Sequence, residues 1–255
     1  MSSPDSRYIA ITHVIGPRIV HGELADGDAI TLADIEQEFS CSRTVAREVQ
    51  RHLEACGLVS AQRRVGLTVR PRDEWNVFHP DVIHWRLHGP DRNRQLESLT
   101  DLRLAIEPRA AFLAARFATR EQRTEILRAG MRVVELGAVS SGAEFMEADV
   151  YFHQLILKYS GNEMFSVLSP VIESILTWRT QLGYMPPQPK PRAMEDHRTA
   201  ALAIYRGKPR EAAAAMHDLV DEVQEAFEHL ITEPDLNHDA PYLPDTSSQA
   251  VDTEE

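Results

Sequence analysis

From Arg92 onward the apolar residues recur with the spacing of an α-helix, and no segment alternates between apolar and polar as a half-buried strand would. Six amphipathic stretches follow one another, at about residues 92–118, 121–137, 142–159, 162–183, 190–206 and 208–231. Helices with one apolar face bury it by packing against one another. The pattern therefore predicts an all-α helical bundle over residues 92–232 of a mostly α protein.

The first 72 residues carry a different pattern, with short helices followed by short strands. The predicted elements are a helix ending at Gly22, helices at 31–39 and 42–55, and strands at 58–61 and 67–70. Thr31 and Ser42 are suited to cap the second and third helices. Three helices and a hairpin in this order predict a winged helix-turn-helix. We expect this domain at residues 1–72, followed at residues 73–91 by a linker and a short connecting helix.

The charge of the chain is unevenly distributed. The net charge is −12, yet residues 1–72 hold 9 basic and 9 acidic side chains. Within residues 40–72 the basic side chains outnumber the acidic ones, and they are Arg43, Arg47, Arg51, Arg63, Arg64, Arg70 and Arg72. One basic patch on an acidic protein indicates local binding of DNA rather than a general coating of nucleic acid or membrane.

The third predicted helix presents arginines on one side. Arg43, Arg47 and Arg51 are spaced four residues apart, so they form a stripe opposite the apolar residues of that helix. A helix that enters the major groove places donors near its N-terminus, which suits the first two arginines. Ser42 and Thr44 can bond to phosphate together with the N-terminal amides of the helix. A solvated arginine face on an ordinary helix is the alternative reading.

Four motifs of this region resemble the GntR superfamily of bacterial transcription regulators. They are Gly22-x-Leu24-x-x-Gly27-Asp28, Ser42-Arg43-x-x-x-Arg47-Glu48, Leu53-x-x-x-Gly57-Leu58-Val59 and Gly66-x-x-Val69. The resemblance implies that the matching residues contact DNA, namely Ser42, Arg43, Thr44, Arg47 and Gly66. Arg63 and Arg64 precede Gly66 in the predicted wing and are expected to join this interface. The chain departs from the superfamily at Ala33, where an arginine that meets a phosphate is usual.

Cysteine content and hydropathy favour a cytoplasmic location. Cys41 and Cys56 are the only cysteines, too few for a disulfide framework or a four-cysteine zinc site. The N-terminus lacks a cationic start followed by a long apolar run, and nowhere are there 18 consecutive apolar residues. We therefore expect no membrane partner. The segment 233–255 is acidic and contains three prolines, which predicts a disordered tail.

Three residues of the helical part have the chemistry of a metal site. Asp149 and His153 are four residues apart on one helix face, and His197 is a third ligand if its helix lies opposite. A capping aspartate and an exposed histidine are the alternative. A divalent, zinc-like ion is the cofactor that this set would hold. Metal-free binding of a ligand by the same side chains stays open.

Residues 92–231 also resemble the FadR-type (FCD) effector domain of the same superfamily. The resemblance rests on Arg103-x-x-x-Glu107, Asp149-x-x-x-His153 and His197. Many such domains place a further histidine where this chain has Leu219. His217 is close in sequence but falls on the polar face of its helix, so we expect it to be exposed.

Other segments are most similar to a galactonate-responsive member of the superfamily. They are Arg72-x-x-Trp75-Asn76, Asp81-Val82-x-x-Trp85 and Glu147-Ala148-Asp149. This similarity implies a sugar acid as effector. Arg103 suits the carboxylate of such a ligand as a bidentate partner, and Arg179 is a second cationic candidate. Asp149, His153 and His197 would meet its hydroxyls.

Together these features predict a homodimeric repressor that binds a pseudo-palindromic operator in double-stranded DNA and responds to a sugar acid. An alternative is a helical-bundle metalloenzyme that uses Asp149, His153 and His197. The absence of a paired Glu-x-x-His motif, an activated nucleophile and a phosphate loop argues against it. An acidic scaffold protein is a third reading, but it leaves the arginine helix and the wing without a role.

Overall fold

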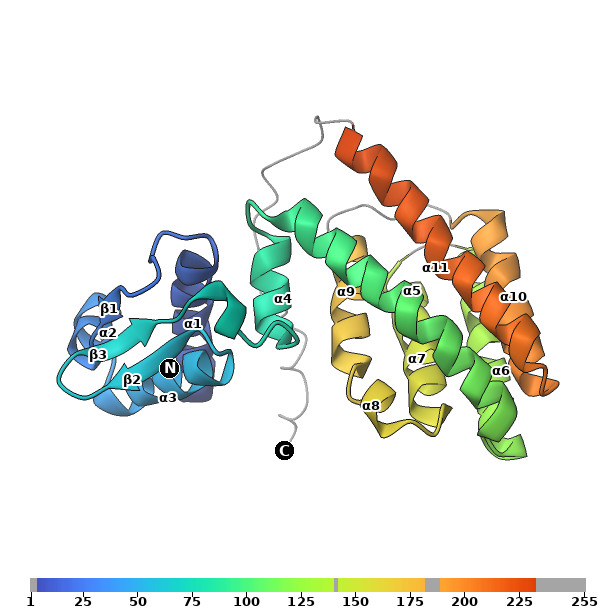
Figure 1. Cartoon of the computed structure of the whole chain (residues 1–255), viewed down its shortest axis with the longest axis horizontal. Helices are drawn as coiled ribbons and strands as arrows, with labels where there is room; N and C mark the ends of the chain where they lie inside the picture. The colour runs from blue at the N-terminus through green and yellow to red at the C-terminus, as the bar shows by residue number, and fades with distance from the viewer. Residues whose placement is uncertain (1–3, 140–141, 182–188, 233–255) are drawn as a thin grey trace, which may run out of the picture.

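The computed structural model describes residues 4–139, 142–181 and 189–232 (Figure 1). It contains a small N-terminal domain, a bundle of helices and a short helix between them. The mostly α fold, with an N-terminal winged helix-turn-helix and a C-terminal helical bundle, is as predicted. The acidic segment 233–255 and the side chain of Arg179 lie outside the described residues.

The N-terminal domain packs three helices against a small antiparallel sheet. Its elements are α1 (Pro4–Val20), β1 (Ala29–Ile30), α2 (Leu32–Glu38), α3 (Arg43–Ala55), β2 (Val59–Gln62) and β3 (Gly66–Val69). The strand order is β1-β3-β2, with Ile30 opposite Leu67 and Ser60 opposite Thr68. The two-residue strand β1 was not predicted, because two residues are too few to show alternation.

Side-chain caps fix the helix-turn-helix. Thr31 and Asp34 form a capping box at the start of α2, and the Ser42 hydroxyl accepts a hydrogen bond from the backbone N–H of Val45 at the start of α3. Between the two helices, Arg7 of α1 donates to the carbonyl oxygen of Ser40 over 2.7 Å. The angle between α2 and α3 is therefore held from outside the turn as well as within it.

The C-terminal domain is wholly helical in its described part. Its helices are α5 (Arg92–Phe117), α6 (Arg120–Gly137), α7 (Ala143–Tyr159), α8 (Glu163–Ser166), α9 (Ser169–Gln181), α10 (Pro191–Tyr205) and α11 (Pro209–Thr232). The long helices α5 and α11 lie side by side (Figure 1). Helix α10 packs against both of them, α7 packs against α5, and α6 packs against α7 and α10. A single apolar core joins these helices.

One predicted helix is wrong. The stretch 162–183 is two helices, α8 and α9, that meet at Val167 and Leu168. Pro170 explains the break, since it has no N–H to donate to a preceding turn and is therefore accommodated in the first turn of a new helix. The apolar spacing continues across the break, which is why periodicity alone predicted one helix.

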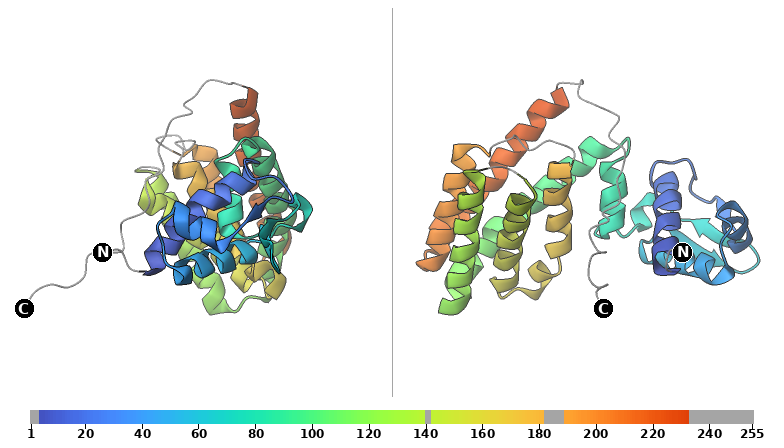
Figure 2. Two further views of the ribbon diagram at one scale, coloured as in Figure 1. Left: turned by 90° about the vertical axis from the view of Figure 1, so that its left-hand side faces the viewer. Right: turned by 180° about the vertical axis from the view of Figure 1, so that it is seen from behind.

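The connecting helix α4 (Pro80–Leu87) lies between the two domains (Figure 2) and contributes buried side chains to both cores. Val82 and Trp85 belong to the core of the N-terminal domain, whereas Ile83 and Leu87 belong to the core of the helical bundle. The segment before α4 is also fixed, because the Trp75 indole donates to the carbonyl oxygen of Arg70 over 2.9 Å. The two domains are thus joined by a packed helix.

Gly16 of α1 has no side chain, and this leaves room for the Trp85 ring of α4. A β-carbon at Gly16 would lie within 2.6 Å of three carbons of the buried Trp85 ring. We expect Gly16→Ala to lower the free energy of unfolding by about 1–2 kcal/mol, since overpacking outweighs the ~1 kcal/mol by which alanine favours a helix. Urea denaturation measures this change.

The same substitution in a Trp85→Leu background is the control. With the ring removed, Gly16→Ala should stabilise the protein, because only the helix propensity remains. If Gly16→Ala stabilised both backgrounds equally, the proposed contact between α1 and α4 would be wrong.

Candidate DNA-binding and effector sites

The helix α3 has one buried and one exposed face. Its apolar side chains are packed into the N-terminal core, and Arg43, Arg47 and Arg51 are exposed. Arg43 donates to Glu36 of α2 over 3.2 Å, and Arg51 pairs with Glu48. Among the described residues, no carboxylate pairs with Arg47. The arginine stripe therefore lies on the surface. Arg47 is the member of the stripe that has no carboxylate partner among the described residues.

Ser42 and Thr44 are exposed at the N-terminus of α3. The Ser42 hydroxyl is engaged in the helix cap, and the cap leaves its O–H free to donate. Ala33 is exposed near the start of α2, so this helix offers no cation at that position. The phosphate contact that an arginine would make there is therefore absent from this chain.

Arg63 and Arg64 are exposed in the turn between β2 and β3. Arg64 adopts the left-handed region with φ 71°, which is unusual for a residue other than glycine. Gly66 has φ +113°, and a β-carbon there would lie 2.7 Å from the carbonyl oxygen of Ile30. Gly66 is therefore required by the close approach of β1, whatever its part in binding DNA.

The predicted effector residues meet inside the helical bundle. Arg103 and Glu107 come from α5, Asp149 and His153 from α7, and His197 from α10, and all five are buried. The sequence-based prediction included Glu107 only as part of the Arg103-x-x-x-Glu107 motif. Its position four residues after Arg103, on the same helix face, was the available signal that it belongs to the cluster.

Hydrogen bonds connect the cluster in one continuous chain. Arg103 Nε donates to Glu107 Oε1, and Glu107 Oε2 bonds to His153 Nδ1. His153 Nε2 lies 3.5 Å from Asp149 Oδ1, and His197 Nε2 lies 2.8 Å from the same oxygen. Arg103 Nη1 is buried and has no hydrogen-bond partner in the part of the chain that the structure describes.

The buried charges shift the titration of their neighbours. Burial alone would lower the pKa of His153, but Glu107 and Asp149 outweigh it and raise that pKa to about 9. Burial likewise opposes ionisation of Glu107, yet Arg103 and His153 lower its pKa to about 2. The pKa of Asp149 also lies well below its usual value, because bonds to both histidines outweigh burial. At neutral pH the cluster therefore holds two carboxylates, Arg103 and a protonated His153.

The donor set suits a divalent ion. Both histidines are anchored through Nδ1, His153 by Glu107 and His197 by the carbonyl oxygen of Ala193 over 2.7 Å. Both Nε2 atoms consequently face Asp149 Oδ1, and anchoring of the far ring nitrogen is how metal-binding histidines are oriented. Asp149, His153 and His197 are the residues that would hold the ion.

The position of a fourth protein ligand is apolar. Leu219 is buried in the core of the bundle, and the side chain of His217 is 56% exposed, as expected. Three protein ligands leave coordination positions for oxygen atoms of water or a ligand.

Comparison with known proteins supports two domains. The family model "Bacterial regulatory proteins, gntR family" matches residues 8–69, and the FCD domain model matches residues 98–222. The galactonate operon transcriptional repressor of Escherichia coli K12 is 31% identical over an alignment of 202 residues, which covers 76% of this chain and 85% of that protein.

Two solved structures are similar in fold. Escherichia coli McbR/YncC has a TM-score of 0.52 at 13% identity and covers 91% of this chain and 100% of its own. Lar, described as controlling expression of the Listeria monocytogenes agr system, has a TM-score of 0.53 at 14% identity and covers 90% and 98%. At these identities the likeness shows the fold alone.

In the described part of the chain, no helix is both long enough and apolar enough to cross a membrane. The family and the relatives are transcription regulators, which decides against the alternative of a metalloenzyme. The chain belongs to the GntR family of bacterial regulatory proteins, in the group that carries an FCD domain, and it is a DNA-binding transcription regulator.

Proposed function

We propose that this chain is a homodimeric repressor that binds a pseudo-palindromic operator through α3 and the wing, and whose operator affinity changes when a sugar acid binds the cluster around Arg103. The observation that carries the effector assignment is the buried Nη1 of Arg103, which has no partner among the described residues. A buried donor without a partner is unfavourable, and a carboxylate would satisfy it. The 31% identical galactonate repressor supports a sugar acid as the ligand class.

The charge balance of the cluster favours binding of a carboxylate together with a cation. Arg103 and protonated His153 balance Glu107 and Asp149, so a monocarboxylate would bring one uncompensated negative charge into a buried site. When a divalent ion is bound, it supplies two positive charges in place of the His153 proton, which leaves one positive charge for the carboxylate. Arg103 would then orient the carboxylate, and the open coordination positions would take hydroxyl oxygens.

The DNA interface combines the exposed stripe of α3 with the wing. Arg43 and Arg47 lie near the N-terminus of α3, where a recognition helix meets base edges. Ser42, Thr44 and the backbone near Gly66 would contact phosphates. Arg63 and Arg64 would add contacts that do not depend on sequence. Repression follows if the operator overlaps a promoter.

Arg47 should carry base recognition. We expect Arg47→Ala to weaken binding to an operator selected from a random duplex library by about 1–3 kcal/mol, and to relax the preference at one base pair. Fluorescence anisotropy at fixed salt measures the affinity. Arg51→Ala is the matched control, because Arg51 lies on the same stripe but farther from the N-terminus and is paired with Glu48. Equal affinities of wild type and Arg47→Ala would refute the assignment.

Two chains should occupy one operator. One recognition helix reads too few base pairs to select a site in a genome, and a two-fold pair of helices reads two half-sites about one helical turn apart. Sedimentation velocity of the saturated complex should therefore give a mass of two chains per duplex. A single chain on a duplex that carries both half-sites would contradict the proposal.

Arg103 should control the response to galactonate. Arg103→Lys keeps the positive charge that Glu107 needs but loses the planar fork, so we expect the half-maximal galactonate concentration to rise roughly tenfold or more. Operator binding without ligand should be unchanged. The measurement is operator anisotropy titrated with galactonate.

His217→Ala is the control, because this side chain is exposed and should leave the response unchanged. Chelation of divalent ions should weaken the wild-type response in the same direction. A response that Arg103→Lys leaves intact would exclude the proposed site, and one that chelation leaves intact would exclude the ion from it.

A further inference from the structure

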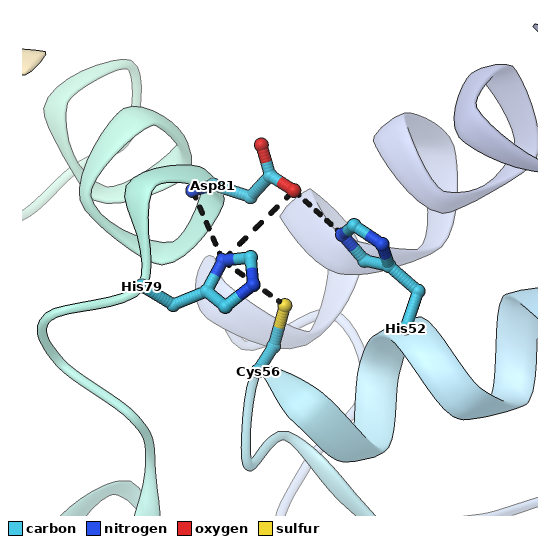
Figure 3. A group of neighbouring side chains, drawn as sticks. All are labelled: His52, Cys56, His79 and Asp81. Atoms are coloured by element: carbon cyan, nitrogen blue, oxygen red, sulfur yellow. Dashed lines mark hydrogen bonds and ion pairs between the residues drawn. The ribbon is translucent and has the colours of Figure 1, made fainter. Parts of the chain in front are cut away.

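A second group of metal-ligating side chains lies between the N-terminal domain and the connecting helix. His52 and Cys56 come from the C-terminal end of α3, and His79 and Asp81 come from the N-terminal end of α4 (Figure 3). All four side chains point toward one another, and one ligand atom from each lies within 4.8 Å of the others. No residue of this group belongs to the DNA-contacting stripe or to the Arg103 cluster.

Two distances in the group are near those of a tetrahedral site, and all of its ligand atoms lie within 4.8 Å of one another. Cys56 Sγ lies 3.6 Å from His79 Nδ1, and His79 Nδ1 lies 3.9 Å from Asp81 Oδ2. Around a zinc ion with bonds of about 2.0–2.3 Å, neighbouring ligand atoms are roughly 3.3–3.7 Å apart. The His52 Nε2 to Asp81 Oδ2 distance of 2.6 Å is shorter, since these atoms share a hydrogen bond. Separating this pair by less than ~1 Å gives the tetrahedral spacing.

We propose that His52, Cys56, His79 and Asp81 form a zinc site that fastens α4 to α3. One thiolate, two imidazoles and one carboxylate are all established zinc ligands, and the soft sulfur disfavours magnesium and calcium. Two ligands come from each side of the junction, so the ion would cross-link the two elements. This inference is independent of the effector and of the operator.

The surroundings of the group suit a bound cation. The Trp85 indole donates to His13 Nδ1, and this leaves the His13 Nε2 proton facing Asp81 Oδ1 at 4.0 Å. This distance is too long for a direct hydrogen bond, but it keeps a donor beside the ligating carboxylate.

The site also explains the arrangement at the start of α4. His79 Nδ1 accepts a hydrogen bond of 3.3 Å from the backbone N–H of Asp81, which is a long and weak cap. The same nitrogen also lies 3.6 Å from Cys56 Sγ (Figure 3). Binding of zinc would exchange this weak cap for a metal bond.

Cobalt(II) added to the metal-free full-length protein tests the site, because cobalt replaces zinc and a cobalt–thiolate bond gives a charge-transfer band in the near ultraviolet. The Asp149, His153 and His197 group contains no sulfur and cannot give this band. We expect the band to appear and saturate as Co²⁺ is added to the wild type, and to be lost when Zn²⁺ is added. Absence of the band in wild type would overturn the proposal.

Cys56→Ser should abolish the band, and Cys41→Ser is the matched control that should keep it. A band that survives in Cys56→Ser, or one that needs Cys41, would overturn the assignment. Because Cys56 is buried, its replacement can affect folding, so His52→Gln and His79→Gln provide a second measurement at partly exposed positions. Each should keep the far-ultraviolet circular dichroism and raise the half-saturating Co²⁺ concentration about tenfold or more. An unchanged midpoint in both variants would refute the site.

Discussion

The helix α4 has eight residues and places side chains in two hydrophobic cores. An α-helix turns by 100° per residue, so neighbouring residues such as Val82 and Ile83 point to different sides, and each side can meet a different domain. Trp85 fills the space above Gly16 on one side, and Leu87 packs against the bundle on the other. The position of α3 relative to the buried Arg103 cluster depends on this packing, because α4 contacts the cores of both domains.

The metal-ligating side chains are arranged in the same way in the bundle and at this junction. In the bundle, Asp149 and His153 on α7 face His197 on α10, and at the junction His52 and Cys56 on α3 face His79 and Asp81. In each case two donors four residues apart on one helix meet donors from a second element. An ion bound in either place would restrain one helix relative to another, which is the motion a ligand-responsive regulator must control.

Much of this arrangement was predictable from the sequence. Periodicity, caps and turn residues predicted the winged helix-turn-helix and the bundle. The spacing of Asp149 and His153, together with the family resemblance that added Arg103, indicated residues that do meet in space. The split at Pro170 was hidden by apolar spacing that continues across it. The junction group was not predicted, since His79 and Asp81 lie 23 or more residues from Cys56, and only the packing of α4 brings them together. The buried Arg103 Nη1, which has no partner among the residues that the structure describes, could likewise be recognised only from the three-dimensional structure.

The backbone conformation of Arg64 in the wing favours glycine for stability, whereas the DNA contact proposed for this residue needs its side chain. Arg64 is held at φ 71°, a conformation that costs an L-residue roughly 1–2 kcal/mol and that glycine adopts freely. A library of this protein screened only for survival of heating would therefore enrich glycine at position 64. The same variants would lose a cation from the exposed tip of the wing. Engineering of a more stable regulator from this chain consequently needs a second selection for operator binding.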